Sequence, residues 1–235
     1  MKRVPRVLVC AGLEPAGRAG LLADLEAIRE SGGLGLGVAT TLTAQGTRSF
    51  HVRPVPAAVV RQQIRALREL GGRFDAVKLG AVPTRQHLAV IRAALRGFRG
   101  WWVVDPVTRT SRGQALSTLT PREYLRLAGP RVVLTPNVPE LAWFGEEARE
   151  LVRRGFGAVV VKGGHAEGAR ATDLVVTRRG VARLNGPRVR RATSRRGTGC
   201  RFASAMAVAL ARGKTPPAAA LEAKRKVLAY LRGAK

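Results

Sequence analysis

The sequence has few of the residues that build metal centres and disulfide frameworks. It contains two cysteines, Cys10 and Cys200, and three histidines, with no CxxC pair and no cluster of Cys and His at ligand spacing. The pattern argues against a zinc site. Two distant cysteines also make no disulfide framework, so we expect a protein of a reducing compartment.

Long apolar runs are missing as well. The apolar run 7–12 near the N-terminus is too short for a signal peptide. No stretch approaches the roughly 20 apolar residues that a transmembrane helix needs. The 235 residues are 46% hydrophobic, which is ample for a buried core. These features predict a soluble, cytoplasmic protein.

Acidic residues are scarce: there are 15 Asp and Glu against 42 Lys and Arg, a net charge of +27. Such an excess can indicate a polyanion-binding protein. However, 35 of the 42 basic residues are arginine, and they are spread through the chain without forming a basic tail. We favour a compositional bias of the source over a polyanion footprint, and we expect no specific nucleic-acid partner.

Hydrophobic patterning predicts alternating strands and helices along the chain. The expected strands are 6–11, 38–43, 76–79, 101–104, 132–134 and 158–161, followed by a hairpin of 175–177 and 181–184. The expected helices are 21–30, 56–70, 84–96, 121–127, 146–154, 199–211 and 216–231. This alternation predicts a single α/β domain over residues 1–235. Its form is a three-layer, doubly wound, mostly parallel sheet with helices on both faces.

Polar and glycine-rich motifs follow the predicted strands, at the edge where α/β sheets bind ligands. Asp105 ends one strand, and Asn137 with Glu140 follows another at a spacing that suits a hydrated magnesium ion. Lys162, after a further strand, suits a phosphate, and the amide of Gln45 suits a pyrimidine edge. Each has an ordinary alternative: a turn residue, a helix cap, a strand-end lysine or a surface glutamine.

The segment 197–200 (Gly-Thr-Gly-Cys) opens an apolar helix. Small residues there let backbone N–H groups cradle an anion. A helix N-terminus favours a thiolate, so Cys200 is predicted to have a lowered pKa, helped by Arg196 and Arg201 if they lie near it in space. The alternatives are a close-packed turn and a small core cysteine, the role we expect for Cys10. His51 and His87 have no ligand-like spacing and are predicted to lie on the surface.

Taken together and in order, these motifs resemble the ribokinase-like superfamily, and within it the hydroxymethylpyrimidine and phosphomethylpyrimidine kinases of thiamine biosynthesis. The resemblance covers nearly the whole chain. The segments that carry it are Ala11-Gly12, Ala23-Asp24-Leu25, Thr43-Ala44-Gln45, Lys78-Leu79-Gly80, Asp105-Pro106-Val107, Thr135-Pro136-Asn137 with Glu140, Lys162-Gly163-Gly164-His165 and Gly197-Thr198-Gly199-Cys200.

The resemblance implies phosphoryl transfer from ATP to a hydroxymethyl group with Mg²⁺ as cofactor. Lys162 and Thr198 would meet the nucleotide phosphates. Asp105, Asn137 and Glu140 would organise magnesium, mostly through water.

It further implies that Cys200 is the catalytic base, or at least the group next to the substrate hydroxyl. The N–H groups of Gly197, Thr198 and Gly199 would hold the transferring phosphoryl group.

For the substrate, the resemblance implies that Gln45 reads the aminopyrimidine and that Gly12 lines its pocket. The loop 108–113 would be a lid. The family often dimerises, so the resemblance leaves a homodimer open, and the sequence itself does not give the oligomeric state.

Two other functions stay open. One is a pyridoxal or pyridoxine kinase, because both substrates are flat heteroaromatic rings with a hydroxymethyl group. The other is a degenerate, non-catalytic member that binds a pyrimidine or a polyanion. The joint presence of Asn137, Glu140, Lys162 and Cys200 argues against the second.

Overall fold

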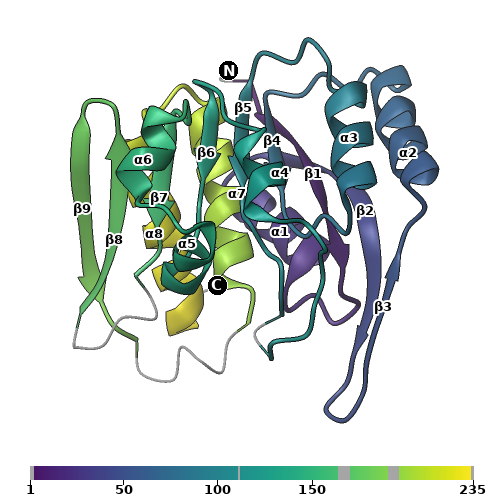
Figure 1. Ribbon diagram of the computed structural model, residues 1–235, viewed down its shortest axis with the longest axis horizontal. Coiled ribbons are helices and arrows are strands. Elements are labelled where there is room, and N and C mark those ends of the chain that lie inside the picture. Colours follow the sequence, from purple (N-terminus) through teal and green to yellow (C-terminus); the bar gives the residue numbers. More distant parts are fainter. Residues whose placement is uncertain (1–2, 111, 164–169, 190–195, 234–235) are drawn as a thin grey trace.

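The computed structural model describes residues 3–110, 112–163, 170–189 and 196–233, and Figure 1 shows one sheet between two layers of helices. The strands are β1 Arg6–Leu13, β2 Leu34–Gln45, β3 Phe50–Pro54, β4 Ala76–Leu79, β5 Trp101–Val104, β6 Val132–Leu134, β7 Ala158–Val161, β8 Arg170–Thr177 and β9 Gly180–Pro187. The helices are α1 Gly20–Glu30, α2 Ala57–Glu69, α3 Arg85–Ala94, α4 Pro121–Leu125, α5 Val138–Phe144, α6 Ala148–Arg153, α7 Thr198–Ala211 and α8 Pro216–Arg232.

The strand order is β3-β2-β1-β4-β5-β6-β7-β8-β9. Neighbours from β2 to β7 pair in parallel, whereas β3, β8 and β9 pair with their neighbours in antiparallel fashion. The predicted mostly parallel, doubly wound sheet is therefore confirmed.

Two apolar cores lie on the two faces of the sheet. One face packs against α2, α3, α4 and α6, through buried side chains such as Ile64, Ile91 and Leu151. The other packs against α1, α7 and α8, where Ile28 and Met206 are fully buried. Among the described residues, no helix is long and apolar enough to cross a bilayer.

The central strands β4, β5, β6 and β7 have the bounds that the sequence predicts. Because helices cover both faces, three of these strands are buried at every position and appear in the sequence as unbroken apolar runs.

The outer elements differ more from the prediction. β3 was not expected, because its alternation of apolar Phe50 and Val52 with polar residues spans only five positions and its side chains are mostly exposed. β1 continues to Leu13 and β2 already begins at Leu34, so both strands are longer than their apolar segments. α5 was expected only as a helical turn.

His87 was predicted to lie on the surface, and this was wrong. Its ring is buried, with Nε2 2.7 Å from the carbonyl oxygen of Val55 and Nδ1 2.8 Å from Thr84 Oγ1. These contacts join the start of α3 to the segment before α2. A single histidine with no ligand spacing carries no sequence signal for such a tertiary contact. His51, on β3, is exposed as predicted.

The two sides of α2 provide a test of the packing. Ile64 is fully buried against the sheet, whereas Val59 on the same helix is 39% exposed. Ile64→Ala should lower the free energy of unfolding by about 2–5 kcal/mol, because it leaves a cavity. Val59→Ala should change it by less than about 0.5 kcal/mol. Urea unfolding of both variants checks this, and equal effects would contradict the packing.

Candidate active site

A buried ion pair lies at the carboxyl edge of the sheet. Lys162, after β7, places Nζ 2.6 Å from Asp105 Oδ1, after β5, and 3.9 Å from Glu140 Oε2 on α5. The backbone N–H of Lys162 donates to the carbonyl of Pro136 at 2.8 Å, and Thr135 Oγ1 donates to Asp105 Oδ1 at 3.3 Å. The ends of three neighbouring strands are thus joined at one point, as the motif positions predict.

The neighbours of Lys162 keep its side chain protonated. Burial acts to lower the pKa of this ammonium, but the carboxylates of Asp105 and Glu140 outweigh burial, and the net pKa is raised. Burial raises the pKa of Glu140, which the ammonium of Lys162 opposes. Lys162 is therefore a fixed cation close to the surface at this edge of the sheet.

Asn137 and Glu140 form a reciprocal cap at the start of α5. Asn137 Oδ1 accepts the N–H of Glu140 at 2.8 Å, and Glu140 Oε2 accepts the N–H of Asn137 at 2.7 Å. The sequence left open an Asn cap followed by a solvated Glu as the alternative to a metal site; the structure shows the Asn cap, but Glu140 completes a capping box instead of being solvated. The cap holds both side chains in place near Lys162, so capping the helix is compatible with a contribution to a magnesium site.

The oxygen donors here fit a largely hydrated magnesium ion. The carboxylates of Asp105 and Glu140 converge on one atom, Lys162 Nζ. Among the residues placed by the structure, no three His, Cys, Asp or Glu side chains come close enough to enclose a metal. One or two carboxylates, with the other positions taken by water and phosphate, are what magnesium uses in phosphoryl-transfer sites.

The first turn of α7 lies over this ion pair. A methyl group at Gly199 would be 3.1 Å from Lys162 Nζ and 3.6 Å from Asp105 Oδ2. Gly197 precedes the helix with φ +78°, and a Cβ there would lie 2.3 Å from the carbonyl oxygen of Arg18. Gly197 is therefore required by its backbone conformation, whereas a methyl group at residue 199 would be tight against the flexible end of Lys162. These contacts place the first turn of α7 directly over the ammonium of Lys162.

The prediction of a lowered pKa for Cys200 was wrong. Burial raises the pKa of this thiol to about 11. The ammonium of Lys78 and the backbone N–H of Gly20 act to lower it, whereas the carboxylates of Asp24 and Asp105 act to raise it. The helix N-terminus does not overcome the loss of water around the sulfur.

The two flanking arginines are engaged elsewhere. The Arg201 guanidinium pairs with Glu26, lies 3.8 Å from Glu30 Oε2 and stacks 4.0 Å above the ring of Tyr230. Arg196 donates to Gln45 Oε1. Adjacency in sequence gave no information on side-chain direction, because consecutive helical residues point to different faces.

Gln45 ends β2, and its amide is already engaged on both sides. Its Nε2 donates to Thr43 Oγ1 at 3.2 Å, and its Oε1 accepts from Arg196. The loop before α7 is thus joined to the end of β2. Gly12 lies on β1 beside Thr41 of β2, and a Cβ there would make only ordinary contacts of 3.7 Å.

Sequence reasoning assigned no function to three side chains beside this site. Lys78 on β4 pairs with Asp24 on α1, and Ser204 on α7 also bonds to Asp24. The sequence signal that could have identified them is a lysine and an aspartate inside otherwise apolar segments.

Gly164 and His165 of the lysine motif lie outside the described residues, as does Ser111 of the loop 108–113. Arg112 of that loop donates to the carbonyl of Gly46 at 2.9 Å.

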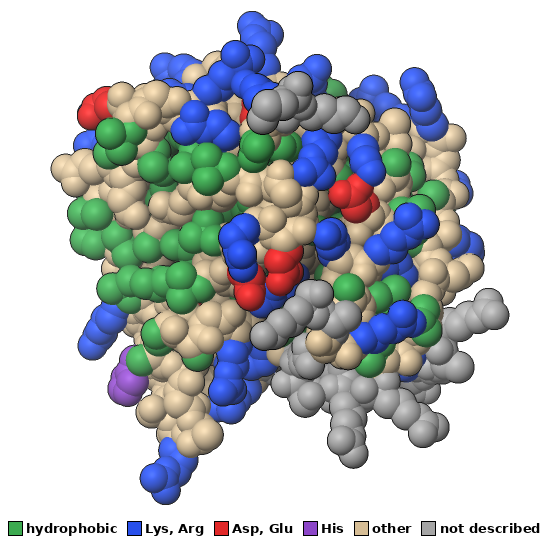
Figure 2. Space-filling model, turned by 180° about the vertical axis from the view of Figure 1, so that it is seen from behind, with side chains coloured by type: hydrophobic (Ala, Val, Ile, Leu, Met, Phe, Trp, Pro, Cys, Tyr) green, Lys and Arg blue, Asp and Glu red, His purple; other side chains and the backbone are tan. Residues whose placement is uncertain are grey.

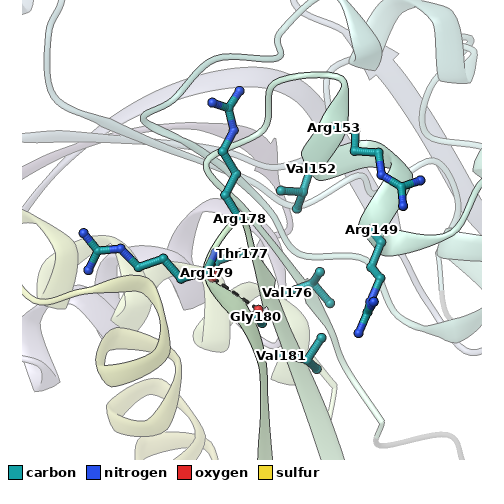
Figure 3. A pocket seen from close by; sticks show the side chains of 9 residues that line it. All are labelled: Arg149, Val152, Arg153, Val176, Thr177, Arg178, Arg179, Gly180 and Val181. Carbon is teal, nitrogen blue, oxygen red and sulfur yellow. Dashed lines mark hydrogen bonds between the residues drawn. The ribbon is translucent and has the colours of Figure 1, made fainter.

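A hollow lies at the opposite edge of the sheet, between α6 and the β8–β9 turn (Figure 3). It measures about 510 Å³, and its lining includes Arg149, Arg153, Arg178 and Arg179. The four guanidinium groups point in different directions and do not converge on one position. Lys and Arg side chains are also scattered over the face shown in Figure 2. Among the described residues, this hollow therefore holds no converging set of guanidinium groups.

The cysteines should differ in reactivity. Cys10 is fully buried, and burial raises its pKa to about 12, whereas Cys200 is half-buried. Iodoacetamide should modify Cys200 first, slowly at neutral pH and about tenfold faster per unit as pH rises toward 11, because only the thiolate reacts. Peptide mapping over a pH series measures this. Faster labelling of Cys10, or free-cysteine rates at Cys200 at neutral pH, would contradict the assignment.

Known proteins resemble this chain over most of its length. The family model described as phosphomethylpyrimidine kinase matches residues 14–234. The hydroxymethylpyrimidine/phosphomethylpyrimidine kinase of Rhizobium meliloti is 37% identical, covering 97% of this chain and 89% of the relative. The thiamine biosynthesis multifunctional protein ThiED of Corynebacterium glutamicum is 34% identical over 90% of the chain. This chain spans 30% of that protein's length.

Solved structures share the fold. Pyridoxal kinase from Staphylococcus aureus in complex with AMP-PCP has a TM-score of 0.85 at 24% identity, with 98% of this chain and 89% of that chain covered. Phosphomethylpyrimidine kinase from Clostridium difficile has a TM-score of 0.77 at 26% identity, with 97% and 100% covered. The ribokinase-like fold is confirmed. With a family model that covers almost the whole sequence, the chain belongs to the phosphomethylpyrimidine kinase family.

Proposed function

We propose that residues 1–235 form one kinase domain that transfers the γ-phosphoryl group of ATP to 4-amino-5-hydroxymethyl-2-methylpyrimidine, to its monophosphate, or to both. The observation that carries the proposal is the Lys162–Asp105 ion pair beneath the first turn of α7, with Cys200 in that same turn. A fixed cation, two carboxylates and a turn of open N–H groups are the parts that phosphoryl transfer needs.

The nucleotide phosphates bind between Lys162 and the start of α7. Lys162 meets the phosphate oxygens as an ammonium, because its carboxylate neighbours keep it protonated. Thr198 and the N–H groups of the Gly197–Gly199 turn hold the transferring group. Asp105, Asn137 and Glu140 organise the magnesium ion, which supplies further neutralisation of phosphate charge when bound.

The acceptor binds on the other side of that turn. Gln45 recognises the ring, Gly12 lines its pocket, and Cys200 faces the hydroxymethyl oxygen. Gln45 is joined to this region through Arg196, which immediately precedes Gly197. The loop 108–113 limits the access of water, and Arg112 links it to the β2–β3 connection beside Gln45.

The substrate assay decides between the candidate acceptors. We expect magnesium-dependent ATP consumption with hydroxymethylpyrimidine, its monophosphate or both, and little with pyridoxal. Each acceptor is tested alone at equal concentration, with an acceptor-free reaction as the control. ATP consumption with pyridoxal alone would show that the protein is a pyridoxal kinase instead. Consumption with none of the three would support a non-catalytic binding protein.

The nucleotide site is tested at its charges. Lys162→Ala and Glu140→Gln should each slow turnover on the order of 100-fold, because a preorganised charge contact contributes about 3 kcal/mol to the barrier. Glutamine at 140 keeps an oxygen for the helix cap. Lys214→Ala is the control, since Lys214 is exposed and bonds only to Glu222 among the described side chains. Turnover at the wild-type rate in both test variants would refute the placement.

Ring recognition is tested at Gln45. Gln45→Ala should raise KM for the pyrimidine while KM for ATP stays constant, because a half-made buried amide contact costs about 1–3 kcal/mol. Gln63→Ala is the matched control, because that amide bonds the backbone N–H and carbonyl of Ala39, away from the proposed site. A weakened ATP KM with an unchanged pyrimidine KM would show that Gln45 lies on the nucleotide side.

A further inference from the structure

A fully buried ion pair lies beside the proposed site and has no part in the function described so far. Lys78 Nζ on β4 is 2.6 Å from Asp24 Oδ2 on α1, and both side chains have zero exposed area. Ser204 Oγ on α7 donates to Asp24 Oδ1 at 2.8 Å. One strand of the sheet and the two helices that cover it are therefore joined at a single carboxylate.

Stability alone does not account for such a pair. Removing two charges from water is costly, and replacing a buried ion pair with apolar side chains is often neutral or stabilising. The surroundings are apolar, since Val7, Val9 and Ala205 are buried in the same core. The position of the pair is therefore the informative feature.

That position is next to Cys200. Cys200 and Ser204 are four residues apart on α7 and face the same side of the helix. Gly20 and Asp24 have the same spacing on α1. The N–H of Gly20 donates to the Cys200 sulfur, and one turn later Asp24 accepts from Ser204. The two helices thus meet at two successive contacts, and Lys78 approaches both from the strand beneath.

The charges that face the Cys200 sulfur can be named. Lys78 acts on it from β4, Asp24 from α1 and Asp105 from the end of β5. Lys162, after β7, also interacts with it electrostatically. Lys162 is committed to Asp105, Glu140 and the nucleotide in the proposed function. Lys78 is thus the cation that remains beside the sulfur throughout the reaction.

We propose that Lys78 is a positioning residue for phosphoryl transfer, in which its ammonium, fixed by Asp24, supplies the permanent positive charge beside the Cys200 sulfur. This inference rests on the proposed function. In the transfer step the acceptor oxygen forms a bond to the γ-phosphorus, and the bond from that phosphorus to the bridging oxygen of ADP breaks. The acceptor proton passes to the Cys200 sulfur in the molecules that carry it as a thiolate, which are a small fraction at neutral pH because burial raises the pKa of this thiol. Lys78 increases that fraction.

The test measures the sulfur directly and needs no turnover. Iodoacetamide labelling of Cys200 is followed against pH in the wild type, Asp24→Asn and Lys78→Met/Asp24→Asn. Asp24→Asn removes the repelling charge, so the midpoint of the labelling curve should fall. The double variant removes the ammonium as well, so its midpoint should lie about one pH unit or more above that of Asp24→Asn. Thermal unfolding of each variant confirms folding.

Lys224→Met is the matched control, because Lys224 forms another buried pair, with Asp173 at 2.8 Å, at the contact between α8 and β8. Its labelling curve should match the wild type. Equal midpoints in Asp24→Asn and the double variant would overturn the proposal. A merely structural contribution of the pair would move both midpoints in the same direction. If Asp24→Asn fails to fold, the double variant, which buries no unpaired charge, is compared with the wild type and should label at higher pH.

Turnover separates this inference from the function on which it rests. Shifted labelling curves in a protein that phosphorylates none of the tested acceptors would leave the charge relationship intact and reject the kinase assignment. Normal kinase activity with unshifted labelling curves would support the kinase assignment and reject the positioning contribution of Lys78. If the kinase assignment and the Lys78 inference are both correct, the double variant should have a lower kcat and an unchanged KM for ATP, since Lys78 is buried away from the nucleotide.

Discussion

The ion pair between Lys162 and Asp105 is the contact on which the rest of the site depends. It joins the ends of β7 and β5, across the intervening end of β6. The pair keeps the lysine charged in a buried position and keeps it within reach of α5 and α7. The first turn of α7 lies over it, and a methyl group at residue 199 would come within 3.1 Å of Lys162 Nζ. The sheet thus brings a cation, two carboxylates and a set of N–H groups to one point.

Three buried lysine–aspartate pairs stand out against the composition. The chain has 35 arginines and only seven lysines, yet Lys78, Lys162 and Lys224 each pair with a buried aspartate. Three of the four aspartates are used in this way. A compact ammonium fits a small buried space that a planar guanidinium would not.

The sequence predicted the parts of the molecule that depend on burial and on strand ends. Four central strands were placed to the residue because their apolar runs are continuous, and the strand-end motifs met where parallel strands must end together. The predictions that were wrong depend on where a side chain points in the folded protein. His87 turns inward to a distant carbonyl, Arg201 turns away to Glu26, and the pKa of Cys200 follows its burial rather than its place on the helix. The Lys78–Asp24 pair joins residues 54 positions apart, which no local pattern shows.

The most direct test of the account is a crystal structure with a non-hydrolysable ATP analogue, Mg²⁺ and hydroxymethylpyrimidine bound together. The account predicts the γ-phosphoryl group on the N–H groups of Gly197–Gly199, with Lys162 at the phosphates. The hydroxymethyl oxygen should lie between that group and the Cys200 sulfur. A nucleotide bound away from the Lys162–Asp105 pair, or a hydroxymethyl group pointing away from Cys200, would contradict it.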